Sequence, residues 1–445
     1  MTHRVASSAL ASTSRQPSAE SGSAGDFIGL RAGERTDYSH GGFQPRPAGQ
    51  TARLLSHAAN REARFVFLLA GAPDADFGVR LLGPDTDWER LLQIAWDENA
   101  IGALRDYCRR LPSGIVPLDV ERRLACLALE RDFRMRVLQK RLEESLSALE
   151  SAGIVVVLLK GAALVATVYG SFASRLMNDI DLLVDPSQAN DAQALMLSVG
   201  WMPDPSLPDD EAYATHHHLP PLLDSRGSGL RVEIHRRLLP VGHPFELTMT
   251  ELWNEARSVT VTGHNALVLQ PNHHALHLGI HFAWSHMMRA GAWHAFRDIG
   301  ALERAGLIDW SEFVPLALRS GASSCCYWML RLGRTLANLS VSDEVLRRLA
   351  PPLGAAVLDR VERHLVHVLF RRGASQLPVR LDRALWSLAI RPQALGHGAV
   401  RPWLVSSELA VARLELDGAP SAGGMARHAE KVRACSAFLA SLMWV

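Results

Sequence analysis

The chain has 445 residues, of which 48% are hydrophobic and 21% charged. This composition is typical of a globular protein and excludes a disordered or coiled-coil chain. The 47 basic and 46 acidic residues leave a net charge of +1, which argues against a protein that holds long nucleic acid through a basic surface. The 5 cysteines form no Cys-x-x-Cys pair, which argues against a disulfide framework and favours a reducing, cytoplasmic location.

The N-terminal 60 residues are rich in Ser, Gly, Ala and Pro, and we expect residues 1–60 to be a disordered tail. The longest apolar stretch, residues 153–173, is long enough to span a bilayer. However, Lys160 lies near its middle, and its first half is rich in β-branched residues, which favours a buried strand. We therefore expect no membrane partner.

N-terminal helices are predicted over residues 85–152. Thr86 and Glu89 have the spacing of a capping box and predict a helix that starts near Trp88. A longer helix is expected from about Asp119, because apolar residues recur there at steps of three and four. Gly153 is a natural end for it.

The pattern then changes to that of a mixed α/β domain over residues 153–269. Strands are expected at 154–159, 179–185, 217–223 and 230–235, with two more within 257–269. Helices are expected at 161–169 and 188–199, the second capped by Ser187. From Pro271 onward the chain is predicted to be helical, at 271–284, 291–305, 310–320, 325–339, 342–350, 354–371 and 426–443. We therefore predict an α+β fold with an all-helical region over 270–445.

Two aspartates stand at the start of the predicted strand 179–185. Asp179 and Asp181 point to the same side, because alternate residues of a strand share a face. Such carboxylates repel each other unless they are solvated, pair with an arginine, or share a divalent cation. Mg²⁺ suits one or two carboxylates together with substrate phosphates, and two such ions would polarise both oxygens of a nucleotidyl displacement.

A third carboxylate stands on the predicted strand 230–235. There Val232 and Ile234 face one way, while Glu233 and His235 face the other. If this strand pairs beside the strand of the two aspartates, Glu233 completes an acidic cluster. His235 would then orient Glu233 or remain a surface histidine.

These pieces occur in a characteristic order, and that order resembles a known family. Leu159-Lys160-Gly161, Arg175, Asp179-Ile180-Asp181-Leu182-Leu183-Val184 and Val232-Glu233-Ile234-His235 resemble an uncharacterised bacterial nucleotidyltransferase family of the DNA polymerase β-like superfamily. The likeness covers about residues 120–305. It implies a polymerase β-like nucleotidyltransferase domain, a mixed sheet with flanking helices. It also implies that Asp179, Asp181 and Glu233 are catalytic and hold Mg²⁺, or Mn²⁺, with a nucleoside triphosphate such as ATP.

The resemblance also places a nucleotide-binding glycine motif. We assign Lys160 and Gly161 to it in preference to Gly170-Ser171, because a strand precedes Lys160 and a helix N-terminus follows it. The family commonly has Gly or Ser after the first glycine, whereas Ala162 stands here. Lys160 would place a charge on the phosphates or extend along the protein surface from a strand end. Arg175 would bind phosphate or hold one of the aspartates.

Histidines mark the helix that starts at Pro271. His273, His277 and His281 recur every four residues, as a candidate metal pair or as a polar face that lines a cleft. The resemblance implies that His281 and Asp298 lie near the cleft. We therefore place His235, His281 and Asp298 on the acceptor side, with Asp298 as a candidate general base.

Three functions follow from these residues. The first is a Mg²⁺-dependent enzyme that moves a nucleoside monophosphate from a triphosphate to a small-molecule, peptide or protein acceptor. The second is a degenerate, non-catalytic nucleotide-binding or protein-interaction module of the same fold, which the missing second glycine favours. The third is a metal hydrolase built on the histidines of the helix after Pro271.

Overall fold

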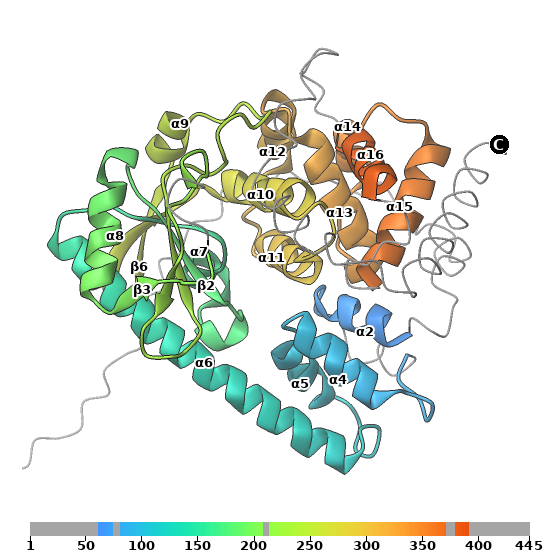
Figure 1. Cartoon of the computed structure of the whole chain (residues 1–445). Coiled ribbons are helices and arrows are strands. Elements are labelled where there is room, and N and C mark those ends of the chain that lie inside the picture. Colours follow the sequence, from blue (N-terminus) through green and yellow to red (C-terminus); the bar gives the residue numbers. More distant parts are fainter. Residues whose placement is uncertain (1–60, 74–80, 208–212, 371–378, 391–445) are drawn as a thin grey trace, which may run out of the picture. The chain divides into compact units, whose positions relative to one another are not determined.

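The computed structural model describes residues 61–73, 81–207, 213–370 and 379–390, all within one unit, Gly49–Val445. Figure 1 shows the helices and strands of these residues in the colours of the sequence. The predicted tail at 1–60 and the predicted helix at 426–443 lie outside them.

Strands of the described residues form one seven-stranded mixed sheet in the order β3-β4-β5-β2-β1-β7-β6. β2 runs parallel to β5, and β1 runs parallel to β7, whereas the other neighbours are antiparallel. The mixed sheet predicted from the sequence is thus present. The strands are β1 (Val157–Leu158), β2 (Asp179–Leu183), β3 (Trp201–Pro203), β4 (Leu222–Asp224), β5 (Arg231–His235), β6 (Arg257–Val261) and β7 (His264–Val268).

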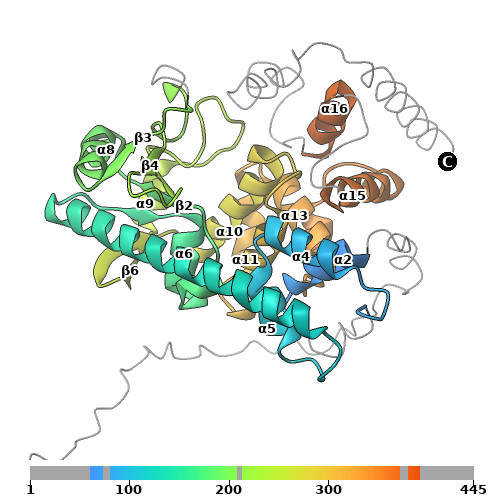
Figure 2. The same ribbon diagram turned by 60° about the horizontal axis from the view of Figure 1, so that its bottom comes forward.

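One face of the sheet packs against two helices, α6 (Leu118–Ser151) and α8 (Ala189–Ser198). The alternate residues Ile180, Leu182 and Val184 join the buried cluster that these helices form with the sheet. The long helix α6 continues beyond the sheet to α5 (Ile101–Cys108), as Figures 1 and 2 show. The residues that alternate with these three along β2 therefore point to the opposite side of the sheet.

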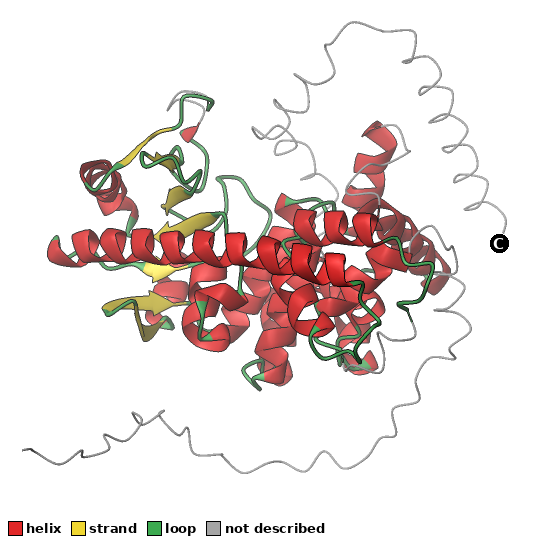
Figure 3. Cartoon of the chain, turned by 90° about the horizontal axis from the view of Figure 1, so that it is seen from below, coloured by secondary structure: helices red, strands yellow, loops and turns green. Residues whose placement is uncertain are grey.

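That opposite side belongs to a larger core shared by the N-terminal helices and the helices after the sheet. Trp293 illustrates the join, since its indole Nε1 donates to the carbonyl of Val66 at 2.9 Å. In Figure 3 the strands lie to one side and most of the helices to the other. The remaining helices are α2 (Arg61–Leu69), α4 (Trp88–Asp97), α9 (Met249–Asn254), α10 (Pro271–Ile280), α11 (Ala292–Arg304), α12 (Trp310–Arg319), α13 (Ser323–Ala337), α14 (Asp343–Leu349), α15 (Ala355–Phe370) and α16 (Val379–Ala389).

Two predicted helix caps were wrong by one or two residues. Asp87 caps α4 and accepts a hydrogen bond from the backbone N–H of Arg90 at 3.0 Å, whereas the hydroxyl of Thr86 accepts from Gly83. Asp185 and not Ser187 caps the short 3₁₀ turn that leads into α8. In both places an Asp stands close to the predicted residue, and Asp is as good a cap as Ser or Thr.

Some predicted elements changed in extent. The strand expected at 154–159 is reduced to β1, and the helix expected at 161–169 is α7 (Lys160–Leu164) followed by the π-helical turn η2 (Val165–Tyr169). The helix after Pro271 likewise ends as α10 and continues as a π-helical turn, η6 (His281–Ser285). Among the described residues, no helix has the combined length and apolar character needed to cross a membrane.

Candidate functional site

The acidic residues lie on two neighbouring parallel strands. Asp179 and Asp181 lie on β2, and in the register of the β2–β5 pair Asp181 stands directly beside Glu233. Their alternate neighbours are buried against α6 and α8, so these carboxylates lie on the opposite face of the sheet. The pairing of β2 with β5, which the prediction of a third carboxylate in this cluster required, is therefore present.

Two basic side chains contact the carboxylates. Lys160 Nζ lies 2.7 Å from Asp181 Oδ1. His235 Nε2 lies 3.0 Å from the same oxygen and 3.3 Å from Glu233 Oε2. Asp181 is 2% exposed, so these contacts are shielded from water and stronger than surface ion pairs. Asp181 thus pairs with a lysine and a histidine, whereas we had considered an arginine partner.

The three acids titrate differently. Burial and the neighbouring Asp181 carboxylate raise the pKa of Asp179 to about 7. Burial also works against the charged form of Asp181, but the Lys160 ammonium and the His235 hydrogen bond outweigh it and lower the pKa to about 2. The same two groups hold the pKa of Glu233 well below its usual value in spite of burial. Asp179 therefore bears most of the repulsion within the cluster.

A tight turn between β1 and α7 brings Lys160 to the acids. Lys160 has φ of +46°, a left-handed backbone conformation that is uncommon for a residue with a side chain. Gly161 follows, and a Cβ there would lie 2.6 Å from Cγ of Met177. A side chain at position 161 would therefore have to displace the side chain of Met177, in the segment before β2.

Arg175 joins the sheet domain to α11. Its guanidinium forms a two-pronged ion pair with Asp298, with Nε and Nη2 each 2.9 Å from a carboxylate oxygen. The hydroxyl of Tyr169 donates to the same carboxylate at 2.8 Å. Asp298 is 1% exposed. Arg175 therefore holds Asp298 and makes no hydrogen bond to either aspartate of β2, which we had considered as its partners. A carboxylate that accepts three such hydrogen bonds is also poorly placed to act as a general base.

A cavity of about 400 Å³ joins these residues. The sheet side of its lining includes Lys160, Gly161, Arg175, Asp179 and Glu233. Its helical side includes His281, His286, His294 and Asp298. Asp181 and His235 lie behind this lining, against Lys160 and Glu233. The structure thus brings all nine predicted site residues to one region, whereas Gly170 and Ser171 are not among the lining residues.

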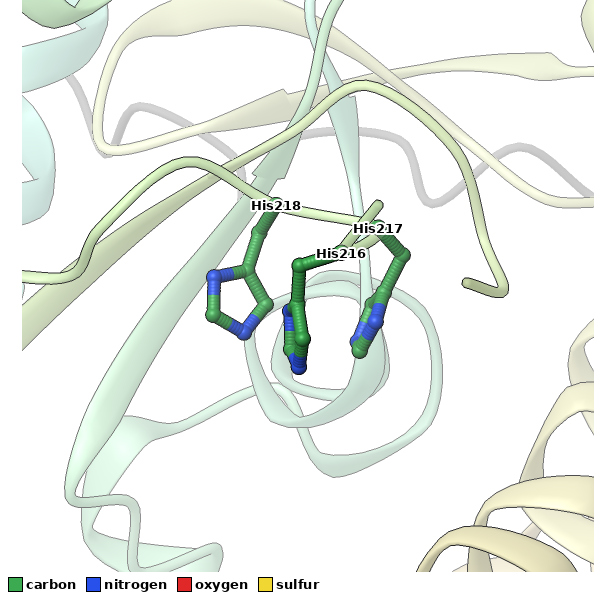
Figure 4. Close-up of side chains that lie close together, drawn as sticks. All are labelled: His216, His217 and His218. Atoms are coloured by element: carbon green, nitrogen blue, oxygen red, sulfur yellow. The ribbon is translucent and has the colours of Figure 1, made fainter. Parts of the chain in front are cut away.

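Three consecutive histidines form another part of the cavity wall. The rings of His216, His217 and His218 lie with centroids 4.2 to 4.7 Å apart (Figure 4). His218 Nε2 lies 3.7 Å from Glu233 Oε2. The sequence shows this run of histidines, but nothing in its pattern predicted that the three rings would converge or that they would meet Glu233.

Two groups of side chains in the described residues can converge on a metal ion. One group is Asp181, Glu233 and His235, and the other is the histidine run 216–218. His273, His277 and His281, among which a His-x₃-His metal pair was predicted, do not form such a group. His273 instead faces Glu251 and Glu255, whereas the rings of His277 and His281 contact each other edge to face with centroids 6.1 Å apart. The structure therefore gives no support to a metal hydrolase built on this helix.

Comparison with known proteins identifies the family of the chain. The model of the family described as "Uncharacterised nucleotidyltransferase" matches residues 84–338, more than half of the chain. No curated protein and no solved structure matches this chain. The matched range contains all the acidic residues of the cluster, the Lys160 turn and the Arg175–Asp298 pair. The chain therefore belongs to the uncharacterised nucleotidyltransferase family, and it is a transferase of phosphorus-containing groups.

Proposed function

We propose that the cavity beside β2 and β5 binds a nucleoside triphosphate with Mg²⁺ and transfers its nucleoside monophosphate to an acceptor. The observation that carries this proposal is the register of β2 and β5, which sets Asp181 beside Glu233, with Asp179 on the same face. Asp179 and Glu233 line a cavity of about 400 Å³, and Asp181 lies directly behind them. Together they form an oxygen-rich donor set beside a space large enough for a substrate.

The donor set fits a hard divalent cation. Asp179, Asp181 and Glu233 would hold it, and their oxygens are the ligands that Mg²⁺ and Mn²⁺ prefer. Burial and the Asp181 carboxylate raise the pKa of Asp179 even with Lys160 in place, so a bound cation would favour the charged form of this carboxylate. When bound, such an ion neutralises charge on the phosphates and polarises the reacting oxygens.

The chain's own residues would position the triphosphate and the acceptor. Lys160 and Gly161 line the cavity next to the acids, so we place the phosphates there. An acceptor oxygen or nitrogen forms a bond to the α-phosphorus and releases its proton to water. The bond from the α-phosphorus to the oxygen that bridges it to the β-phosphorus breaks, and pyrophosphate leaves with that oxygen. Arg175 lines the same cavity but is held by Asp298, so we assign it to positioning the wall that faces the acceptor.

His281 and Asp298 belong to the opposite wall, where we place the acceptor. The net charge of +1 argues against long nucleic acid in this role, and we propose a small molecule, a peptide or a protein side chain. We also propose that the sheet domain has the polymerase β-like fold, which the parallel pairing of β2 with β5 supports.

The alternative is a degenerate module that binds nucleotide without turnover. Ala162 in place of a second glycine favours it. The presence of three acids, a lysine and an open cavity at one place favours an active site instead, because this donor set can hold the Mg²⁺ that polarises the reacting oxygens.

A labelling experiment tests the proposed transfer. Wild-type protein is incubated with Mg²⁺, a mixture of low-molecular-weight cell metabolites and protein, and a triphosphate labelled at either the α- or the γ-phosphorus. We expect α-label on an acceptor and γ-label in pyrophosphate, and neither with the Asp179→Asn/Asp181→Asn variant. Transfer of γ-label to an acceptor would contradict the proposal, as would Mg²⁺-dependent binding of the triphosphate without any transfer.

A further inference from the structure

The run His216-His217-His218 forms a compact cluster of imidazoles outside the acidic site. One ring nitrogen from each of the three lies within 4.8 Å of the others. In a tetrahedral zinc site, nitrogen ligands about 2.0–2.1 Å from the ion stand about 3.3 Å apart. The three side chains point into the same space (Figure 4), but the rings of His216 and His217 are stacked with their planes 26° apart. These two rings would therefore turn about their Cβ–Cγ bonds to direct a nitrogen at one shared ion.

The hydrogen bonds of the rings leave nitrogens free to bind a cation. His218 Nδ1 lies 2.6 Å from the carbonyl oxygen of Leu219, an arrangement that makes Nδ1 the donor and leaves the Nε2 lone pair free. Such a carbonyl contact is what fixes the ring of a metal-binding histidine. The Nδ1 atoms of His216 and His217 are buried and have no hydrogen-bond partner among the described residues. An unpaired buried nitrogen costs free energy unless something binds it.

The backbone holds this cluster rigidly against β5. His218 forms a β-bridge with His235, and the N–H of Leu219 donates to the carbonyl of Ile234 at 2.9 Å. The carbonyl of His217 accepts from the N–H of Arg236 at 2.8 Å. Three successive side chains of a regular strand would alternate in direction, so this anchored loop is what allows the rings to converge.

The charge around the cluster suits a cation. Glu233 lies on one side, at 3.7 Å from His218 Nε2, and the wider acidic group carries three carboxylates against one lysine.

We propose that His216, His217 and His218 bind a transition-metal ion of the Zn²⁺ class in the cavity wall beside Glu233. Imidazole nitrogens select such an ion, whereas the carboxylate oxygens of β2 and β5 select Mg²⁺. The protein would thus hold two cation sites of different chemistry in one cavity. Three protein ligands leave a fourth position for water or a substrate group, as in open zinc sites. This inference does not depend on the proposed nucleotidyl transfer.

The test is a zinc titration of the full chain, untagged and stripped with a chelator, by calorimetry, with Co²⁺ as a spectroscopic probe. We expect one equivalent of Zn²⁺ to bind, and tetrahedral Co²⁺ absorption to appear. The His216→Ala/His217→Ala variant should lose this equivalent by more than about 100-fold in affinity, because even outer partners of metal sites contribute about 10- to 100-fold. The milder His216→Asn variant should lose part of the affinity for Zn²⁺.

Two controls make the result specific. His264→Ala changes a histidine of β7 that pairs with Glu150, away from the cluster, and should leave zinc binding unchanged. Asp179→Asn/Asp181→Asn disables the acidic site and should leave the same equivalent in place. Circular dichroism melting of each stripped variant shows whether it is folded. The proposal is overturned if the wild type binds no stoichiometric Zn²⁺, if folded histidine variants bind it equally well, or if binding disappears with the two aspartates.

Discussion

Lys160 Nζ lies 2.7 Å from Asp181 Oδ1, although Lys160 begins α7 and Asp181 lies on β2. The lysine supplies the positive charge nearest to three carboxylates, with His235 as the second basic neighbour. The Lys160 ammonium therefore acts on the same carboxylates that we propose as ligands of the cation. The ion pair therefore couples the acidic cluster to the turn that we assign to the phosphates.

Replacement of this lysine should tighten the binding of Mg²⁺ in the absence of nucleotide. In Lys160→Met the ammonium no longer competes for Asp181, and a hydrogen bond between charged groups is worth about 1.5–3 kcal/mol. We expect roughly a tenfold or greater gain in Mg²⁺ affinity, measured by calorimetry. Lys140→Met is the matched control, because Lys140 pairs with Glu143 at an exposed site of α6, where such pairs contribute little. Equal Mg²⁺ affinities in the wild type and Lys160→Met would refute this coupling.

Loss of Asp298 should destabilise the protein strongly. Asp298→Ala leaves the buried guanidinium of Arg175 without its carboxylate, and breaking a buried pair in this way costs about 3–5 kcal/mol. Denaturant unfolding measures the loss. The double variant Arg175→Met/Asp298→Leu should recover much of it, since an apolar pair leaves no unpaired charge. A cost below about 1 kcal/mol for Asp298→Ala would show that the pair does not hold α11 to the sheet domain.

A side chain at Gly161 should disturb both stability and nucleotide binding. The added Cβ of Gly161→Ala would meet the side chain of Met177, which lines the cavity together with Gly161. Overpacking of this kind costs about 1–3 kcal/mol, and the displaced Met177 would narrow the space for phosphates. Gly354→Ala is the control, because nothing lies within 4 Å of a Cβ at that position. Unchanged stability and unchanged nucleotide affinity in Gly161→Ala would argue against a role for this turn.

The free energy of unfolding should decrease as the pH is lowered, because His274 is buried. Burial lowers the pKa of His274 to about 4, from a usual value of about 6.5 in an unfolded chain. Below pH 6.5 the imidazole of His274 becomes protonated in the unfolded chain, whereas in the folded protein it stays neutral until about pH 4. The contribution of His274 is therefore complete above pH 6.5 and is lost as the pH falls towards 4, by roughly 3 kcal/mol.

The measurement is urea unfolding at several pH values between 4 and 7 for the wild type and for His274→Gln. The variant should show a smaller loss of unfolding free energy across this range. Asp298 and Arg175 are the charged groups near His274, and both remain in the variant. The same pH slope in both proteins would contradict the assignment to His274.

The sequence predicted which side chains of the site share a face better than how their strands assemble. The alternation around Asp181 and Glu233 predicted that these carboxylates lie on the face opposite Ile180 and Val232, because the period of a strand is local information. Their direct juxtaposition depends on parallel pairing of two strands far apart in the chain, which local patterns do not determine. The partner of Arg175 was missed for the same reason, since Asp298 lies 123 residues away.

The unpredicted elements have weak local signals. β3 is only three residues long, Trp201–Pro203, and ends at a proline. α2 (Arg61–Leu69) is only 9 residues long and follows directly on the segment rich in Ser, Gly, Ala and Pro. The convergence of His216, His217 and His218 depends on a loop that is anchored to β5, so the run was visible but its geometry was not.

The most direct test of the acidic cluster is calorimetric titration of each nucleoside triphosphate with Mg²⁺ into the wild type and Asp179→Asn/Asp181→Asn. Both proteins should first be shown to have the same unfolding midpoint. We expect the wild type to bind at least one triphosphate only when Mg²⁺ is present, and the variant to lose this binding. If the wild type binds no triphosphate, or if the folded variant binds as tightly as the wild type, the carboxylates of β2 and β5 do not form the nucleotide site.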